Sequence, residues 1–244
     1  MVENMAKAPN NFPLSRAETN NYRFERKFVF DNLDLEEIIN SHVLNNSYFF
    51  KEVYERRTVN NIYFDDWSHS FYKMNVSGVG IRSKYRLRWY GDDYKVISNS
   101  ILEIKKKLGE VGDKLLFKLP NLKMDLTTKS VDNAFQIILS HITDKKLLSE
   151  VERLFPLLYS SYERRYFLSE DEKFRITLDY NMKFYNPNID QYMLSEMGID
   201  DIILELKYLT RDDFKARKLS QSFDQRLSKN SKYVRGYDML YGLR

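Results

Sequence analysis

The chain has 244 residues, a formal net charge of +4 and a pI near 8.9, and 43% of its residues are hydrophobic. This length and apolar content suit one large domain or two small ones, and they exclude an unfolded, collagen-like or low-complexity chain. The absence of cysteine excludes disulfides, thiolate metal sites and cysteine nucleophiles. The three histidines, at positions 42, 69 and 141, lack the spacing of a zinc triad and argue against a Ser-His-Asp relay.

No stretch approaches the roughly 20 apolar residues of a transmembrane helix, and the N-terminus lacks the apolar region of a secretory signal. We therefore expect a cytoplasmic protein. Residues 1–20 are predicted to form a flexible arm. Residues 21–244 show no repeat, composition shift or long linker, so they are predicted to form a single domain.

Eight segments alternate between apolar and polar residues with a period of two, which predicts β-strands. In chain order they are Tyr22–Phe30, Arg57–Asp65, Ile81–Tyr90, Ile101–Lys107, Lys114–Leu119, Ser160–Leu168, Phe174–Tyr180 and Ile202–Leu209. Helical periodicity separates them at Leu35–Val43, Ser68–Asn75, Val131–Ile142, Lys145–Phe155, Arg211–Leu227 and Tyr237–Leu243. The expected fold is α+β, a closed antiparallel barrel of about eight strands with helices packed on the outside.

The charged residues of these strands share one face. In the strand from Ile81 to Tyr90, the even positions are Arg82, Lys84, Arg86, Arg88 and Tyr90, whereas the odd positions are mostly apolar. The same alternation recurs in most of the other strands. Together the charged faces carry eleven basic residues, namely Arg23, Lys27, Arg82, Lys84, Arg86, Arg88, Lys105, Lys107, Arg164, Arg175 and Lys207. They carry five acidic ones, namely Glu25, Asp65, Glu103, Asp179 and Glu205.

An antiparallel sheet with one solvated face would also give such alternation. The sign of the charges argues against it here, because like charges at alternate positions repel unless an anion relieves them. If the charged face turns inward, the barrel encloses a basic tunnel suited to a long, linear polyanion. The acidic residues Glu25, Glu103 and Glu205 would then pair with neighbouring cations or hold a divalent cation. Pairing is favoured for any one of them, and metal binding by at least one is favoured for the group.

Short motifs follow one another in the order found in a known family. They are Arg23-Phe24-Glu25-Arg26-Lys27-Phe28, Asn61-Ile62-Tyr63-Phe64-Asp65, Lys84-Tyr85-Arg86-Leu87-Arg88-Trp89-Tyr90, Leu102-Glu103-Ile104-Lys105, Tyr162-Glu163-Arg164, Arg175-Ile176-Thr177-Leu178-Asp179, Leu204-Glu205-Leu206-Lys207 and Ser231-Lys232-Tyr233-Val234. From about Tyr22 to its end, the chain resembles the VTC domain, the catalytic part of the vacuolar transporter chaperone polyphosphate polymerase. That family belongs to the triphosphate tunnel metalloenzymes, alongside the CYTH phosphatases.

The resemblance implies a tunnel that binds ATP and inorganic polyphosphate or triphosphate and that needs Mn²⁺ or Mg²⁺. Matching positions assign phosphate contacts to Lys27, Arg86, Arg88, Lys105, Arg164 and Lys232, and the metal to Glu205. Lys114 stands where a further phosphate-binding lysine is expected, and Lys118 is close enough in spacing to be the alternative match for that position. We predict catalytic roles for Lys27, Arg86, Arg88 and Lys232. The charged faces add Arg23, Lys84, Lys107, Arg175 and Lys207 as phosphate-binding candidates, and Glu103 and Glu25 as metal candidates.

The chain departs from the family pattern in its first strand. The superfamily has acid-x-acid-x-Lys, whereas this sequence has Arg23-x-Glu25-x-Lys27. Losing one acid argues against the hydrolytic two-metal arrangement, and a cation at that position suits polymerisation better. The sequence contains neither an SPX domain nor a membrane portion, so regulation and a membrane partner protein are not inferred.

The favoured hypothesis is a polyphosphate polymerase that transfers the γ-phosphate of ATP to a growing chain. A tunnel triphosphatase or polyphosphatase is the second hypothesis. A non-catalytic polyanion or nucleic-acid binder is the third, in which the basic strands form an open surface with stacking aromatics. A net charge of only +4 disfavours a duplex DNA binder.

Overall fold

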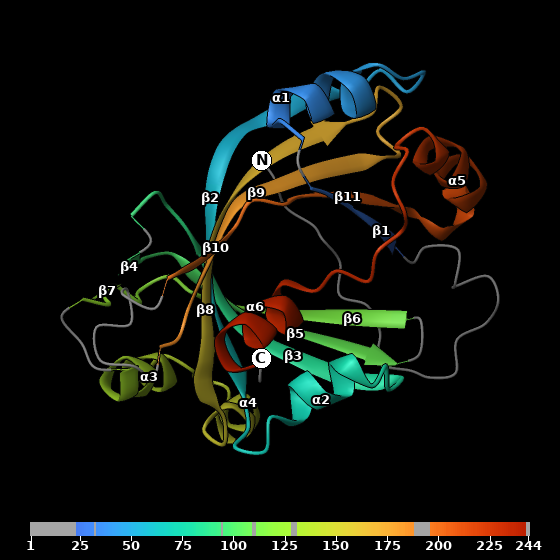
Figure 1. The fold of residues 1–244 in the computed structure, drawn as a ribbon. Helices are drawn as coiled ribbons and strands as arrows, with labels where there is room; N and C mark the ends of the chain where they lie inside the picture. Colours follow the sequence, from blue (N-terminus) through green and yellow to red (C-terminus); the bar gives the residue numbers. More distant parts are fainter. Residues whose placement is uncertain are drawn as a thin grey trace.

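The computed structural model describes residues 23–31, 33–93, 95–108, 111–127, 131–187 and 196–242. The arm predicted at residues 1–20 lies outside this range. One large antiparallel sheet organises the described chain (Figure 1). Its main path runs β1 (Arg23–Phe30), β11 (Ile202–Leu209), β9 (Arg175–Tyr185), β8 (Phe155–Leu168), β2 (Lys51–Asp65), β3 (Ile81–Tyr90), β5 (Ser100–Leu108) and β6 (Val111–Leu119). These eight strands correspond one to one to the eight predicted segments.

Three short strands complete the sheets. Strand β10 (Met197–Ile199) pairs with β9 outside the main path, whereas β4 (Val96–Ile97) and β7 (Met124–Asp125) form a separate two-stranded sheet. Period-two alternation detects none of them because each has only two or three residues.

The large sheet curls strongly, but its closure into a barrel is not confirmed. An ion pair joins Lys105 of β5 to Glu25 of β1, strands near opposite ends of the path, so the two ends face each other. No pairing between β1 and β6 is present in the described part of the chain. Instead the segment before the last helix bridges β1, with Leu227 opposite Phe28, and the backbone N–H of Ser228 donates to the carbonyl of Lys27 at 2.8 Å.

Helices α1 (Leu35–Ile38), with its π-helical extension Ile39–Leu44, α2 (Ser70–Val76), α3 (Val131–Ser140), α4 (Lys145–Val151), α5 (Asp213–Gln221) and α6 (Lys232–Tyr241) flank the sheet. A 3₁₀ turn, Thr210–Asp212, leads into α5. Helix α4 ends at Val151 and not at the predicted Phe155, because β8 already begins at Phe155. Helix α5 ends at Gln221, before the predicted Leu227. The last helix begins five residues before the predicted start. Its N-cap is Ser231, whose hydroxyl accepts from the backbone N–H of Val234. None of the described helices is long and apolar enough to cross a membrane.

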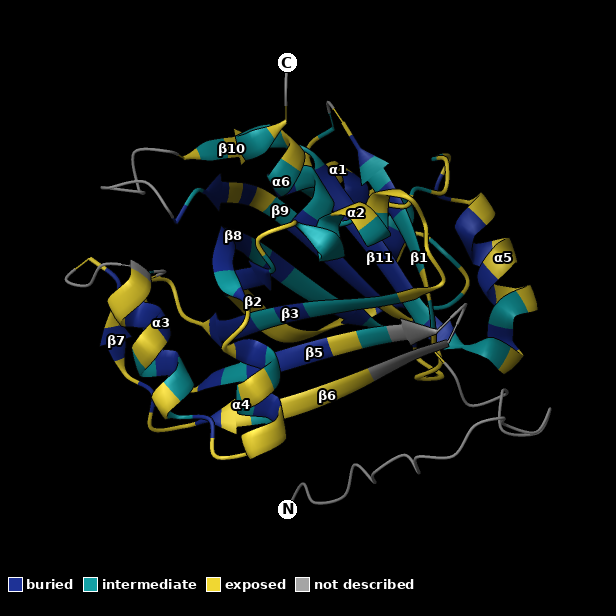
Figure 2. Cartoon of the chain, turned by 90° about the horizontal axis from the view of Figure 1, so that it is seen from below, coloured by how far each residue is buried: buried dark blue, intermediate teal, exposed yellow. Residues whose placement is uncertain are grey.

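The hydrophobic core lies mainly on the outer face of the sheet, beneath helices. Helices α3 and α4 cover Leu87, Leu102 and Ile104, while α1, its extension and α5 cover the apolar face of β1, β9 and β11. Strands β8, β9 and β11 are buried along most of their length (Figure 2), and their buried residues on the outer face are mainly apolar. The charged side of each strand therefore turns inward, as the alternation predicts.

Helix α6 departs from the predicted arrangement, because it packs against the inner face of the sheet. Gly236 faces Leu158 of β8 and Phe184 of β9 so closely that an added Cβ would lie 2.8 and 2.5 Å from their side chains. Tyr233 joins the same core cluster and is 2% exposed. The prediction that all helices pack on the outside is therefore wrong for α6, whose apolar stripe and small glycine fit the inner surface. As a result the first turn of α6 lies beside the inward-facing charges.

Candidate phosphate-binding site

Strand register brings opposite charges together on the inner face. Arg86 of β3 lies directly opposite Glu103 of β5, and Arg164 of β8 lies opposite Asp179 of β9. Lys27 of β1 lies opposite Glu205 of β11 in the same way. Side chains of directly opposed residues point to the same face and come within reach of one another. Three ion pairs therefore follow from the strand pairing alone.

The pair of Arg86 and Glu103 is part of a larger, buried cluster around Glu103. Its Oε1 accepts from Lys114 Nζ at 2.8 Å, and its Oε2 accepts from Arg86 Nε at 2.6 Å. Arg88 approaches the same carboxylate at 3.9 Å. Burial opposes ionisation of Glu103, but Arg86, Arg88 and Lys114 lower its pKa to about 2. One carboxylate thus neutralises only part of the charge of three cations.

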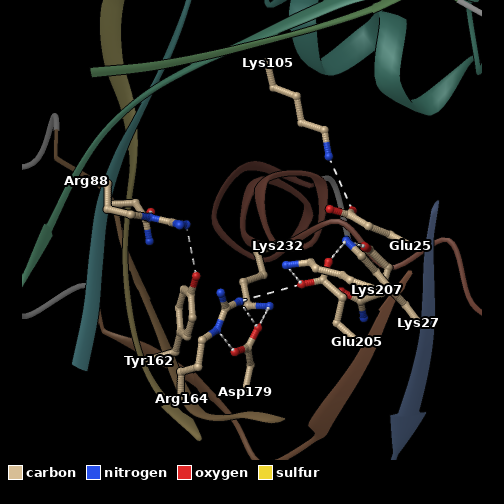
Figure 3. A network of polar contacts seen from close by, with 12 residues as sticks. Glu25, Lys27, Arg88, Lys105, Tyr162, Arg164, Asp179, Glu205, Lys207 and Lys232 are labelled. Atoms are coloured by element: carbon tan, nitrogen blue, oxygen red, sulfur yellow. Dashed lines mark hydrogen bonds and ion pairs between the residues drawn. The ribbon is translucent and has the colours of Figure 1, made fainter. Parts of the chain in front are cut away.

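A second cluster surrounds Asp179 and Glu205 (Figure 3). The guanidinium of Arg164 donates twice to Asp179, at 2.5 and 2.7 Å, and Lys232 Nζ donates to the same carboxylate at 2.5 Å. Glu205 pairs with Lys27 at 3.2 Å and Lys207 at 2.8 Å. Arg164 lies 3.9 Å from Glu205 as well, so it joins the two carboxylates.

The neighbouring cations keep both carboxylates ionised. Burial alone would raise the pKa of Asp179, but Arg164 and Lys232 lower it to about 2. Burial likewise opposes the charge of Glu205, and Lys27, Lys207 and Arg164 hold its pKa well below the usual range. The same burial opposes the charge of Lys27, but Glu205 raises its pKa above the ordinary lysine value.

Tyr162 of β8 links the two clusters (Figure 3). Its hydroxyl accepts from Arg88 at 3.2 Å, and Lys232 Nζ lies 4.7 Å from the centre of its ring. The ring also lies 5.4 Å from the guanidinium carbon of Arg164. A buried phenol thus holds cations from three elements around one point.

The segment that leads into α6 contributes neutral acceptors to the site. Lys84 Nζ donates to the Ser231 hydroxyl at 2.9 Å, and Lys27 Nζ donates to the carbonyl of Asn230 at 3.1 Å. No carboxylate in the described chain pairs with Lys84. The pKa of Lys84 is lowered to about 7, mainly by burial and to a smaller extent by repulsion from its cationic neighbours.

We define the basic cluster as these linked side chains. It contains nine cations and four carboxylates, namely Lys27, Lys84, Arg86, Arg88, Lys105, Lys114, Arg164, Lys207 and Lys232, with Glu25, Glu103, Asp179 and Glu205. The excess positive charge is a local property, because the whole chain has a net charge of only +4. An anion that contacts several of these cations would relieve their mutual repulsion.

The family model of the VTC domain matches residues 22–241. The chain belongs to the VTC domain family. A comparison with curated proteins finds no match.

Among solved structures, a "putative adenylyl cyclase" from Hippeastrum with a dominant triphosphatase activity aligns with a TM-score of 0.50 and 12% identity, over 86% of this chain and 94% of that one. At this identity the likeness concerns the fold alone. A "putative adenylate cyclase" from Vibrio parahaemolyticus aligns with a TM-score of 0.48 and 13% identity, over 88% of this chain and 97% of that one. The RNA triphosphatase domain of a mimivirus mRNA capping enzyme aligns with a TM-score of 0.39 and 15% identity, over 85% and 90% of the two chains.

Most of the site residues expected for this VTC domain come together in the basic cluster. Of the twelve cations proposed from the sequence, Arg23 and Arg175 are exposed at strand ends and form no ion pair with the described residues. The backbone of Lys107, on β5, lies opposite that of Arg82, on β3, but the structure does not describe the side chain of Lys107. Lys118, the alternative to Lys114, forms no ion pair with Glu103.

Sequence reasoning missed three contributors to the site. The sequence places Asp179 on a charged face and predicts no role for it, although it orients both Arg164 and Lys232. Tyr162 stands two residues before Arg164, and this spacing on one strand was the signal that it shares the inner face. Asn61, 0% exposed, accepts from Arg88 Nε at 2.8 Å, and only its place in the motif Asn61-Ile62-Tyr63-Phe64-Asp65 signals it in the sequence.

The three glutamates proposed as metal ligands do not gather. Each of them is bound by different cations, and the described chain contains no group of three or more potential ligands from His, Cys, Asp and Glu. Glu205 instead lies close enough to Asp179 for its charge to act on the pKa of Asp179, and Arg164 contacts both carboxylates. Any divalent cation here would thus have at most these two carboxylates as close protein ligands.

Proposed function

We propose that this VTC domain is a metal-dependent polyphosphate polymerase that transfers the γ-phosphate of ATP to the end of an inorganic polyphosphate chain. The observation that carries the proposal is the basic cluster, where nine cations converge around only four carboxylates. A single phosphate would contact few of them, whereas a linear chain of phosphates could contact all in succession. Family membership over residues 22–241 supports the same substrate class.

The chain's own residues supply positioning and charge neutralisation. Arg86, Arg88 and Arg164 are rigid, forked donors, already oriented by Glu103, Asn61 and Asp179, and together with Lys105 they would hold the phosphates of ATP. Lys27 and Lys232 would orient the terminal phosphate of the acceptor chain. Such preorganised positive charge is the main requirement of phosphoryl transfer.

The reaction needs no covalent enzyme intermediate. An oxygen of the acceptor's terminal phosphate forms a bond to the γ-phosphorus, and the bond from that phosphorus to the β,γ-bridging oxygen breaks. The electron pair leaves with ADP. Because the attacking oxygen is already ionised, no protein side chain has to act as a general base.

The donor set also fits a divalent metal bound jointly with phosphate. Mg²⁺ and Mn²⁺ prefer carboxylate oxygens and commonly take only one or two of them together with substrate phosphates. Glu205 and Asp179 are ionised and adjacent, so they would hold the cation. When bound, it would supply further neutralisation of phosphate charge.

Hydrolysis of triphosphate is the second candidate, and the likeness to the Hippeastrum protein, whose triphosphatase activity is described as dominant, is the observation that favours it. A triphosphatase must orient a water molecule for attack. All four carboxylates of the basic cluster are held in ion pairs, which favours transfer to phosphate over activation of water. Orthophosphate release without chain growth would support hydrolysis instead.

The test is to incubate the purified protein with ATP and Mn²⁺ and to resolve polyphosphate on a gel. We expect chain synthesis by the wild type, and a loss of at least tenfold in Arg86→Ala, Arg164→Ala and Glu205→Ala. Arg165→Ala is the matched control, because Arg165 stands next in sequence but pairs with Glu36 and Glu52 on the outer face. Wild-type rates in the Arg164 variant, or an equal loss in the Arg165 control, would refute the assignment.

A further inference from the structure

Beyond the phosphate site, the inner face carries an aromatic group that the proposed reaction does not use. Along β3 the inward-facing residues change from Arg82 and Lys84 at one end to Tyr90 at the other. Strand β2 pairs with β3, and β8 pairs with β2 on its other side (Figure 1), and the inner faces of these two strands add further side chains to the group. We call this group the tyrosine cradle; it consists of Tyr54, Arg57, Tyr90 and Tyr166.

Arg57 lies at the centre of the cradle and is held by aromatic rings. Its guanidinium carbon lies 5.2 Å from the ring centre of Tyr54, 5.7 Å from that of Tyr166 and 5.9 Å from that of Tyr90. No carboxylate among the described residues pairs with it. Cation–π contact therefore orients this guanidinium without neutralising its charge.

The cradle is open to solvent. Tyr54 is 51% exposed and Tyr90 is 41% exposed, and the side chain of Arg57 is exposed as well. Core packing does not account for large rings left this far exposed on the inner face. Grouped aromatic rings with an arginine plane form the kind of surface on which nucleobases stack.

The cradle also adjoins the basic cluster. Arg57 lies directly opposite Arg164 in the pairing of β2 with β8. The Tyr166 ring lies 6.0 Å from the guanidinium carbon of Arg164 and also contacts Arg57. A molecule with a planar base joined to a row of phosphates could thus stack in the cradle while its phosphates reach Arg164 and Arg88.

We propose that the tyrosine cradle binds the nucleobase of the donor nucleoside triphosphate. This inference rests on the proposed function and adds a direction to it: the nucleoside enters at the Tyr90 end of β3. The phosphate row then points along β3 from Arg88 towards Lys84. Because stacking uses the π-face that every base has, the cradle selects nucleotides over inorganic phosphates without selecting one base strongly.

The test compares two ligands that differ only in the nucleoside. Dissociation constants are measured calorimetrically, with Mn²⁺, for the β,γ-imido analogue of ATP and for inorganic imidotriphosphate. We expect Tyr90→Ala and Tyr54→Ala each to weaken nucleotide binding about tenfold, as loss of one base stacking partner does, and to change inorganic triphosphate binding less than twofold. Tyr90→Phe keeps the ring and should restore nucleotide affinity.

Trp67→Ala is the control for loss of an exposed aromatic ring. Trp67 is 83% exposed and stacks on Phe155 away from the cradle, so its removal should affect neither ligand. Thermal unfolding of each variant checks that it is folded. Equal weakening of both ligands would assign the cradle to the phosphate path, and no weakening would remove it from the site; either result overturns this inference. Failure of the wild type to bind either ligand would overturn the proposed function itself, and this inference with it.

Discussion

Lys84 makes the affinity for polyanions depend on pH in a way that the structure specifies. Burial and the charges of Lys27, Lys105, Arg82 and Arg86 lower its pKa to about 7, from an ordinary lysine value of 10.5. A bound polyanion favours the charged ammonium, so binding raises the pKa of Lys84 and takes up a proton. Free Lys84 is about nine-tenths protonated at pH 6 and about one-tenth protonated at pH 8.

The expected magnitude follows from these fractions. If only protonated Lys84 supports tight binding, the affinity for inorganic tripolyphosphate falls about tenfold between pH 6 and pH 8, and roughly half a proton is taken up per molecule bound at pH 7. Titration calorimetry in buffers of different ionisation enthalpy measures both quantities.

The ligand's own terminal phosphates also titrate, so a variant must isolate the contribution of Lys84. Lys84→Arg keeps a permanent charge at this position, because a guanidinium does not deprotonate in this range. We expect this variant to bind with a flatter pH dependence and to lose the additional proton uptake. Identical pH profiles and identical proton uptake in wild type and Lys84→Arg would refute the reasoning.

Three further predictions concern the elements that hold the site. Glu103→Gln leaves the three cations around this 5%-exposed carboxylate without their counter-charge. We therefore expect urea denaturation to show a loss of about 3 kcal/mol in the free energy of unfolding. Tripolyphosphate should stabilise this variant more than the wild type, and equal stabilisation would contradict the charge argument. Glu103 and Asp179 have pKa values lowered to about 2. The stability they contribute is therefore complete above about pH 4.5 and is lost as the pH falls through about 2. Denaturant midpoints measured from pH 6 to pH 2.5 test this, and a midpoint independent of pH would contradict it. Gly236→Ala places a Cβ 2.5 Å from Phe184 and 2.8 Å from Leu158. We expect a lower melting temperature, a loss of about 1–3 kcal/mol in the free energy of unfolding, and a raised KM for ATP because α6 moves. An unchanged melting temperature would contradict this, because it would show that the contact relaxes freely.

Much of the fold could be predicted because inward and outward residues alternate so regularly. Strands such as Ile81–Tyr90 carry charge on nearly every inner position and apolar side chains on most outer ones, and this identified all eight strands of the main path. The predicted closure of the sheet into a barrel is not confirmed, because closure depends on which backbone occupies the free edge of β1. In the structure the segment at Leu227 and Ser228 does so.

The position of α6 and its consequences were also beyond sequence reasoning. Nothing in its periodicity distinguishes a helix on the outer face from one on the inner face, and Gly236 is informative only once its neighbours Leu158 and Phe184 are known. The matched motif did predict that Lys232 belongs to the site. Only the structure explains why, since Ser231 caps the helix and its first turn brings Lys232 to Asp179.

The role of Asp179 shows the same limit. An aspartate among basic residues predicts an ion pair, but the strand register decides which cations it holds. Here the pairing of β8 with β9 places Arg164 directly opposite Asp179. The cation-rich face could be predicted, whereas the partners of each charge could not.

The central claim is that the inward-facing cations bind a chain of phosphates. The most direct measurement is a crystal structure of the protein with inorganic tripolyphosphate. We predict phosphate oxygens within hydrogen-bond distance of Arg86, Arg88, Arg164 and Lys232, with the ion inside the curl of the sheet. Tripolyphosphate bound only to outer-face cations such as Arg165, with the inner ion pairs unchanged, would contradict the account.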